Sequence, residues 1–109
     1  MLVLFVLYLY SSGIQGADMH VAIIGLGEVG RCYAKPLYEH GVRLSLCEAR
    51  PSAAATELAR AWGLPLHVAP GPWLADVDWV MSCVTGAQAL PVAEQVSAHL
   101  ARGAGLVNR

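Results

Sequence analysis

The sequence of residues 21–37 is VAIIGLGEVGRCYAKPL. Four apolar residues lead into three glycines, at positions 25, 27 and 30, with the spacing G-x-G-x-x-G. A short β-branched run that ends at a glycine is typical of a buried parallel strand followed by a tight turn. A helical pattern begins at residue 28. The stretch therefore predicts a strand, a turn and a helix, around which the rest of the chain can be placed.

Further helices and strands alternate along the chain. The helix at 28–40 contains Pro36, which removes a hydrogen bond, and should stop at Gly41. The helix in PSAAATELARAWG should have Ser52 as its N-cap and Gly63 at its end. The other expected elements are strands at 42–47, 66–68 and 79–84, a loop with a helical turn at 69–76, a helix at 88–100 with Pro91 in or near its first turn, and a fifth strand beginning at 105–107.

This alternation predicts a parallel sheet with helices on both faces. Right-handed crossovers give a doubly wound arrangement, and the strand order 3-2-1-4-5 places the glycine turn at the switch point. We expect an α/β fold, a Rossmann-type doubly wound parallel sheet truncated after about five strands. This domain should span residues 19–109.

Residues 1–18 differ from the rest. MLVLFVLYLY is almost wholly apolar, and SSGIQGAD after it is small and polar. A secretory signal would have Lys or Arg before its apolar run, and this run has neither. It is also shorter than the roughly 20 residues of a membrane span. Because Met19 stands directly before the first strand, we interpret residues 1–18 as an upstream extension. A weak signal or anchor, or an extra strand or helix, stays open.

Composition limits the class of protein. A chain of 109 residues with a net charge of −1 is one small domain with no electrostatic reason to bind nucleic acid. Its 56% hydrophobic content is high for a soluble domain, and indicates an apolar leader together with surface that associates with another chain or with itself. Three distant cysteines (Cys32, Cys47, Cys83) and scattered histidines predict no metal site and favour the cytoplasm.

The glycine spacing is typical of a dinucleotide-binding turn. The first glycine permits the tight turn, the second lets a pyrophosphate approach the backbone, and the third lets the helix pack on the strand. The N–H groups at the helix start then face the phosphates. The motif gains weight because it follows a strand, opens a helix and precedes an acidic residue roughly 20 positions on. The candidate cofactor-binding residues are Gly25, Leu26, Gly27, Glu28, Val29 and Gly30; a tight turn without a ligand is the alternative.

The preference between NAD and NADP depends on two charged residues. Glu48, at the end of the second strand, can accept hydrogen bonds from ribose hydroxyls and would repel a 2′-phosphate, which favours NAD. Arg50 can pair with that phosphate. The alternatives are a solvated acid and a plain surface charge. We expect NAD or NADP as cofactor, with NAD favoured.

Three stretches resemble the 6-phosphogluconate and 3-hydroxyisobutyrate dehydrogenases, the β-hydroxyacid dehydrogenase family. They are IIGLGEVG, EHGVRLSLCEARPSAA and ADVDWVMSCVTGAQAL. The resemblance implies backbone contact of Cys83, Val84 and Thr85 with the cofactor. NADP-using members often carry Asn-Arg-Thr where this chain has Glu48, Ala49 and Arg50, so the arginine is missing or displaced by one.

The resemblance also implies where catalysis would take place. In that family a lysine paired with an asparagine, in a helix beyond the fifth strand, handles the proton. Lys35 is the only lysine here and lies on the first helix. We therefore predict no catalytic residue in this chain, and a small hydroxyacid as substrate only if a C-terminal domain is supplied. A non-catalytic nucleotide-binding regulatory module and a truncated gene product are the alternative functions.

Overall fold

The computed structural model describes residues 18–108, so the predictions for residues 1–17 lie outside the described chain. The elements are, in order, β1 (His20–Ile24), α2 (Glu28–Glu39), β2 (Arg43–Cys47), α3 (Ala53–Trp62), β3 (Leu66–His67), the 3-10 helix η2 (Pro72–Asp76), β4 (Trp79–Ser82), α4 (Gly86–Ser97) and β5 (Gly105–Asn108). Within the described part, no helix is long and apolar enough to cross a membrane.

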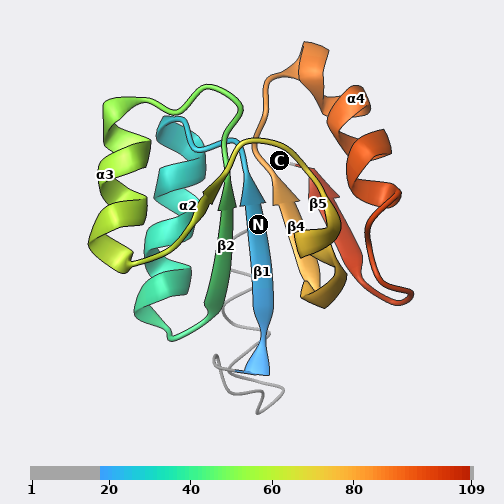
Figure 1. Cartoon of the computed structure of the whole chain (residues 1–109), viewed down its shortest axis with the longest axis horizontal. Coiled ribbons are helices and arrows are strands. Elements are labelled where there is room, and N and C mark those ends of the chain that lie inside the picture. Colours follow the sequence, from blue (N-terminus) through green and yellow to red (C-terminus); the bar gives the residue numbers. More distant parts are fainter. Residues whose placement is uncertain (1–17, 109) are drawn as a thin grey trace.

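The strands form one five-stranded parallel sheet in the order β3-β2-β1-β4-β5. β1 is central and pairs with β2 on one side, from His20 opposite Arg43, and with β4 on the other, from Val21 opposite Trp79. In Figure 1 the strand arrowheads point to the same edge, where α2 and α4 begin. The prediction of an α/β fold with a five-stranded parallel sheet is confirmed.

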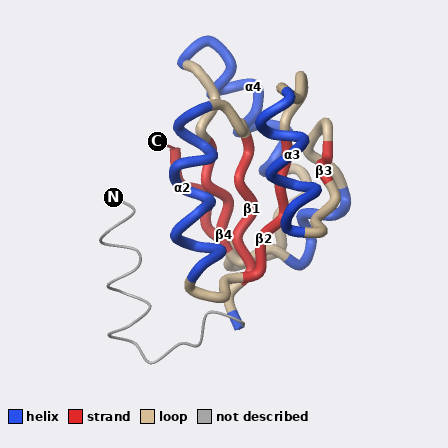
Figure 2. Tube along the Cα trace, turned by 90° about the vertical axis from the view of Figure 1, so that its left-hand side faces the viewer, coloured by secondary structure: helices blue, strands red, loops and turns tan. Residues whose placement is uncertain are grey.

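Helices cover both faces of the sheet. Because successive side chains of a strand point to opposite faces, each strand contributes to two cores. Figure 2 shows α2 and α3 in front of the sheet and α4 behind it. The core under α2 and α3 includes Val21, Ile23, Ala34, Leu37, Leu44, Leu46, Ala55 and Ala59. The core under η2 and α4 includes Ala22, Ile24, Cys47, Leu74, Val77, Val80 and Val96.

The ends of α3 follow from the sequence as predicted. The side chain of Ser52 accepts a hydrogen bond from the Ala55 N–H at 3.1 Å, which satisfies one of the free donors at the helix start. Gly63 ends the helix with φ +66°, in the left-handed region that favours glycine. Gly41, at φ +78°, plays the same role just after α2.

Several predicted boundaries shift. β4 ends at Ser82 rather than at residue 84, because its partner β1 turns away at Gly25 after the pairing of Ile24 with Ser82. α4 begins at Gly86 rather than at residue 88, since the Gln88 N–H already bonds the Thr85 carbonyl. Pro91 therefore lies inside the helix and not in its first turn.

Four other boundaries move as well. α4 ends at Ser97 instead of residue 100. After Ser97 the His99 N–H bonds the Val96 carbonyl, three residues back, and the chain tightens into a turn. α2 ends one residue earlier than expected, β2 begins one residue later, and β3 ends one residue earlier.

Candidate functional site

Gly25 makes the turn from β1 into α2. Its φ of +93° lies in the region that favours glycine, and a Cβ there would come within 2.9 Å of the Cys83 carbonyl carbon. Its N–H donates to the Cys47 carbonyl at 2.9 Å, which continues the β1–β2 pairing to the turn. The fold therefore requires glycine at this position on two grounds, backbone angle and space.

Gly30 is required by packing alone. It is buried in the first turn of α2, and a Cβ on it would overlap the carbonyl oxygen of Gly25. The helix start thus presses directly on the turn that precedes it. Any side chain at residue 30 would push α2 away from the sheet.

Gly27 differs from both. Its φ of −69° and ψ of −166° are extended backbone that any residue adopts, and no atom lies within 4 Å of a Cβ placed there. It is exposed and forms the N-cap of α2. Nothing in the described fold requires a glycine at this position, so the space beside it is open.

The N-terminus of α2 has no side chain that caps it. The first N–H groups of a helix lack partners within the helix and carry the positive end of its dipole, so they attract an anion. Glu28 is exposed and Val29 half-buried in this first turn. α4, which begins at the same edge of the sheet, also lacks a side-chain cap at Thr85.

Glu48 reaches the glycine turn, as the sequence predicts for an acid at the end of β2. Its Oε1 accepts a hydrogen bond from the Leu26 N–H at 3.0 Å. Its own N–H donates to the His67 carbonyl at 2.8 Å, which fixes the backbone from which the carboxylate extends. Among the described residues, its second oxygen has no partner in a hydrogen bond or ion pair.

Arg31 also reaches the turn, and sequence reasoning missed it. Its Nη1 donates to the Leu26 carbonyl at 3.0 Å, and the side chain is half-buried. Leu26 itself is buried under α2. Arg50, by contrast, is exposed and joins no hydrogen bond or ion pair with the described residues.

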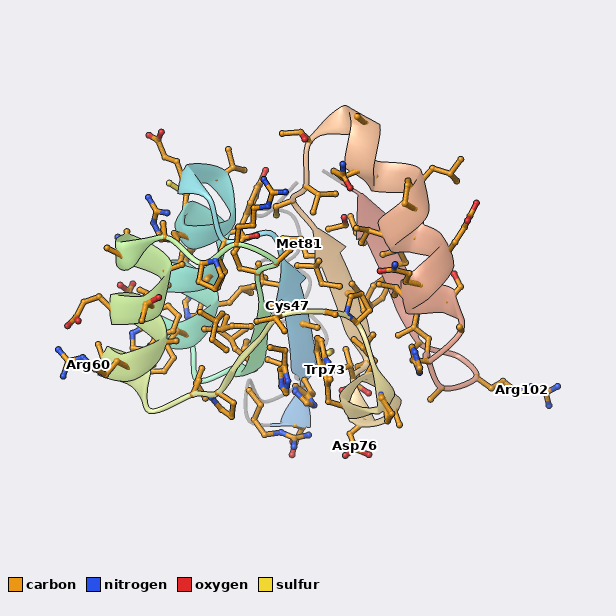
Figure 3. All side chains as sticks on the ribbon, turned by 45° about the horizontal axis from the view of Figure 1, so that its top comes forward. Cys47, Arg60, Trp73, Asp76, Met81 and Arg102 are labelled. Carbon is orange, nitrogen blue, oxygen red and sulfur yellow. The ribbon has the colours of Figure 1, made fainter. Side chains whose placement is uncertain are left out.

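Cys47 lies directly below this turn, on the face covered by η2. Burial raises the pKa of its thiol from 9.0 to about 11, and the charge of Glu48 beside it contributes in the same direction. Figure 3 shows Cys47 over the middle of the sheet, whereas Arg60 and Arg102 project from opposite flanks. The thiol is thus held neutral and is a poor nucleophile at ordinary pH.

Cys83, Val84 and Thr85 lead from β4 to α4, and the first two lie against Gly25 of the glycine turn. The Cys83 N–H donates to the Ile24 carbonyl at 2.7 Å, and its carbonyl faces Gly25. Thr85 is exposed at the start of α4. The structure therefore brings Cys83 and Val84 beside the turn, while Thr85 lies at the start of the following helix.

A second polar cluster lies at the opposite edge of the sheet. His20 Nε2 is 2.7 Å from Ser45 Oγ, its Nδ1 is 3.1 Å from the Asp76 carbonyl oxygen, and its N–H donates to Asp78 Oδ2 at 2.9 Å. These bonds join β1, β2 and the end of η2. Within residues 18–108, no group of three or more His, Cys, Asp or Glu could hold a metal ion. The cluster anchors the crossover between β3 and β4.

Comparison with known proteins finds a similar fold in a solved structure. No protein family and no curated protein matches the chain. The structure resembles the crystal structure of a conserved hypothetical protein from Sinorhizobium meliloti 1021, with a TM-score of 0.72 and 27% sequence identity. The similarity covers 88% of this chain and 34% of that one. This chain therefore spans about a third of the length of the protein it resembles.

Proposed function

We propose that this chain is a Rossmann-type domain that binds NAD or NADP at the carboxyl edge of its sheet, as the nucleotide-binding part of an oxidoreductase. The proposal concerns the turn between β1 and α2, the acid that follows β2 and the connection from β4 to α4. These three segments meet where β1 lies between its two neighbours. In open parallel sheets, ligands bind where the strand order reverses in this way.

The observation that carries the proposal is the contrast among the three glycines. The fold requires Gly25 and Gly30, because a Cβ would meet backbone atoms at both. It does not require Gly27, whose Cβ position is open. A glycine that the fold does not need, at an uncapped helix start, is suited to a ligand that must approach the backbone closely. The space beside Gly27 and the free donors of α2 fit a pyrophosphate.

Each residue of the site would have a distinct role in binding. The N–H groups of Glu28 and Val29, at the start of α2, would donate to the pyrophosphate. The Glu48 oxygen that does not bond Leu26 would accept from a ribose hydroxyl. The backbone of Cys83 to Thr85 would line the path toward the nicotinamide. The bound cofactor would supply hydride chemistry, which side chains alone cannot provide.

The proposal for this chain is limited to binding. Proton transfer from a hydroxyacid needs a positioned acid or base. The carboxylates in the turn and just after β2 are Glu28, exposed, and Glu48, which holds Leu26, and the thiol of Cys47 at the end of β2 is buried and neutral. We propose that dehydrogenase activity of the β-hydroxyacid type would need a further domain, and that the chain works in the cytoplasm.

The test is a titration of the purified chain with NADH, followed by nicotinamide fluorescence. Gly27→Val would place a branched side chain in the open space and should weaken binding by about 100-fold or more, because the pyrophosphate could no longer approach. Ala53→Val is the control, since it introduces the same branched side chain at the exposed first residue of α3. It should change the affinity by less than about twofold.

Both variants should stay folded and lose at most about 1 kcal/mol of stability through capping and helix propensity, because neither residue is buried. Circular dichroism and urea unfolding check this. Undiminished NADH binding by Gly27→Val would refute the assignment of the turn. Wild-type protein that binds neither NADH nor NADPH would refute the function itself.

A further inference from the structure

Two opposite charges hold the same residue of the glycine turn. Glu48 accepts from the Leu26 N–H at 3.0 Å, and Arg31 donates to the Leu26 carbonyl at 3.0 Å. The N and O atoms of one residue are separated only by its Cα and carbonyl carbon, so the carboxylate and the guanidinium are held at the two polar ends of Leu26, at most roughly 10 Å apart. They form no ion pair in the described chain.

The two charged groups reach Leu26 from different elements. Glu48 comes from β2, the neighbour of β1 on the side of α3, and the Leu26 N–H points toward it. Arg31 reaches the same residue from the first turn of α2. The cation therefore holds the same residue, Leu26, as the acid that would contact the adenosine ribose in the proposed function.

The chemistry of the two groups toward a ribose is opposite. A carboxylate accepts hydrogen bonds from the 2′-hydroxyl and repels a 2′-phosphate, whereas a guanidinium binds phosphate through several N–H donors. A guanidinium has five N–H donors, and Arg31 commits one nitrogen to Leu26. The others remain for an anion that arrives beside Glu48.

Resting on the proposed dinucleotide function, we propose that Arg31 is a specificity-determining residue that lets this site accept a 2′-phosphate despite Glu48. The affinity for NADP then depends on Arg31 much more than the affinity for NAD. The displaced Arg50 is not needed for this, because Arg31 already lies at the turn.

The experiment separates this role from that of a residue that only holds the turn. Calorimetric titration of the full chain would use two fragments, 5′-AMP and adenosine 2′,5′-bisphosphate, which differ only in the 2′-phosphate. Arg31→Met should weaken the bisphosphate by about tenfold or more and 5′-AMP by less than about threefold, since only the former loses a charge-assisted bond. Lys35→Met removes the same charge from an exposed position one turn along α2, and should change either affinity by less than about twofold.

Arg31→Gln provides a second variant if Arg31→Met fails to fold, because glutamine keeps an N–H donor for Leu26 but has no charge. It should show the same selective loss. Equal weakening of both fragments would mean that Arg31 only positions the turn, and would overturn its role in specificity while leaving the proposed function intact. A wild-type chain that binds neither fragment and neither dinucleotide would overturn both.

Discussion

The starts of α2 and α3 differ in how their first backbone N–H groups are satisfied. Both helices follow a strand of the same sheet and begin at the same edge. α3 begins at Ser52, whose hydroxyl oxygen accepts from the Ala55 N–H. α2 begins at Gly27, which has no side chain to offer, and its first donors stay open.

The difference shows where stability and binding are separated in this small domain. A cap such as Ser52 contributes about 1 kcal/mol to a helix. The start of α2 forgoes this contribution, although Glu48 and Arg31 hold the adjoining Leu26 firmly. A rigid turn with open donors is the arrangement that an anion site needs.

The largest expected effect comes from adding a Cβ at Gly30, where α2 packs directly on the turn. Gly30→Ala should lower the free energy of unfolding by about 2–3 kcal/mol, because the new Cβ would overlap the Gly25 carbonyl oxygen. This loss already includes a gain of about 1 kcal/mol from the better helix propensity of alanine. Urea unfolding measures it.

Gly86→Ala is the matched control for that variant. Gly86 is the first residue of α4, and a Cβ there would meet nothing within 4 Å. Its stability should stay within about 0.5 kcal/mol of the wild type. If Gly30→Ala were equally harmless, α2 could move away from the turn. The start of α2 would then not be the rigid site that the comparison with α3 assumes.

The next effect concerns the strand that leads to α3. The pKa of Cys47 rises from 9.0 to about 11 on folding, so the unfolded thiol ionises first as the pH increases. The resulting stabilisation is complete below pH 9 and is lost as the pH rises to 11. We expect the wild type to lose about 1–2 kcal/mol of unfolding free energy over this range through Cys47.

Cys47→Val isolates that contribution, because it fills a similar space without an ionisable group. The difference in unfolding free energy between wild type and variant should be constant up to pH 9 and shift in favour of the variant above it. Parallel curves between pH 9 and 11 would show that the thiol is not shielded as its burial implies.

The smallest effect tests the comparison at the two caps themselves. Ser52→Ala removes the oxygen that accepts from Ala55 and should cost about 1 kcal/mol, or a drop in Tm of about 5 °C. Gly27→Ala should cost only about 0.5 kcal/mol, since glycine is the better N-cap but its Cβ position is open. Thermal unfolding measures the Tm of both variants. An equal drop in Tm would contradict the difference between the two helix starts.

Local signals predicted the elements well where one residue type decides the geometry. Ser52 and Gly63 mark the two ends of α3. An N-cap depends on one hydroxyl oxygen, and a positive φ depends on one residue without a side chain. The end of β4 was predicted two residues too late, because its apolar run continues past Ser82 while its partner β1 turns away at Gly25. A strand's length depends on its neighbour as well as on its own sequence.

The candidate site, like the elements, could be predicted only in part from the sequence. Glu48 could be identified from its distance to the glycines and from its place after a strand. Arg31 could not, because its bond to Leu26 reaches back five residues from the helix to the turn, a spacing that follows no helical or strand period. The open space beside Gly27 and the overlap at Gly30 needed the packed structure, since both positions are simply glycine in the sequence.

The bonds of His20 have a consequence for how the chain folds. Ser45 is 25 residues away along the chain, and Asp76 and Asp78 are 56 and 58 residues away. Closing the longer loop costs more entropy, so we expect β1 to pair with β2 first and to wait for β4 with one edge unpaired. His20 would then be among the last residues to complete its contacts, which makes it a natural reporter for the slow step of folding.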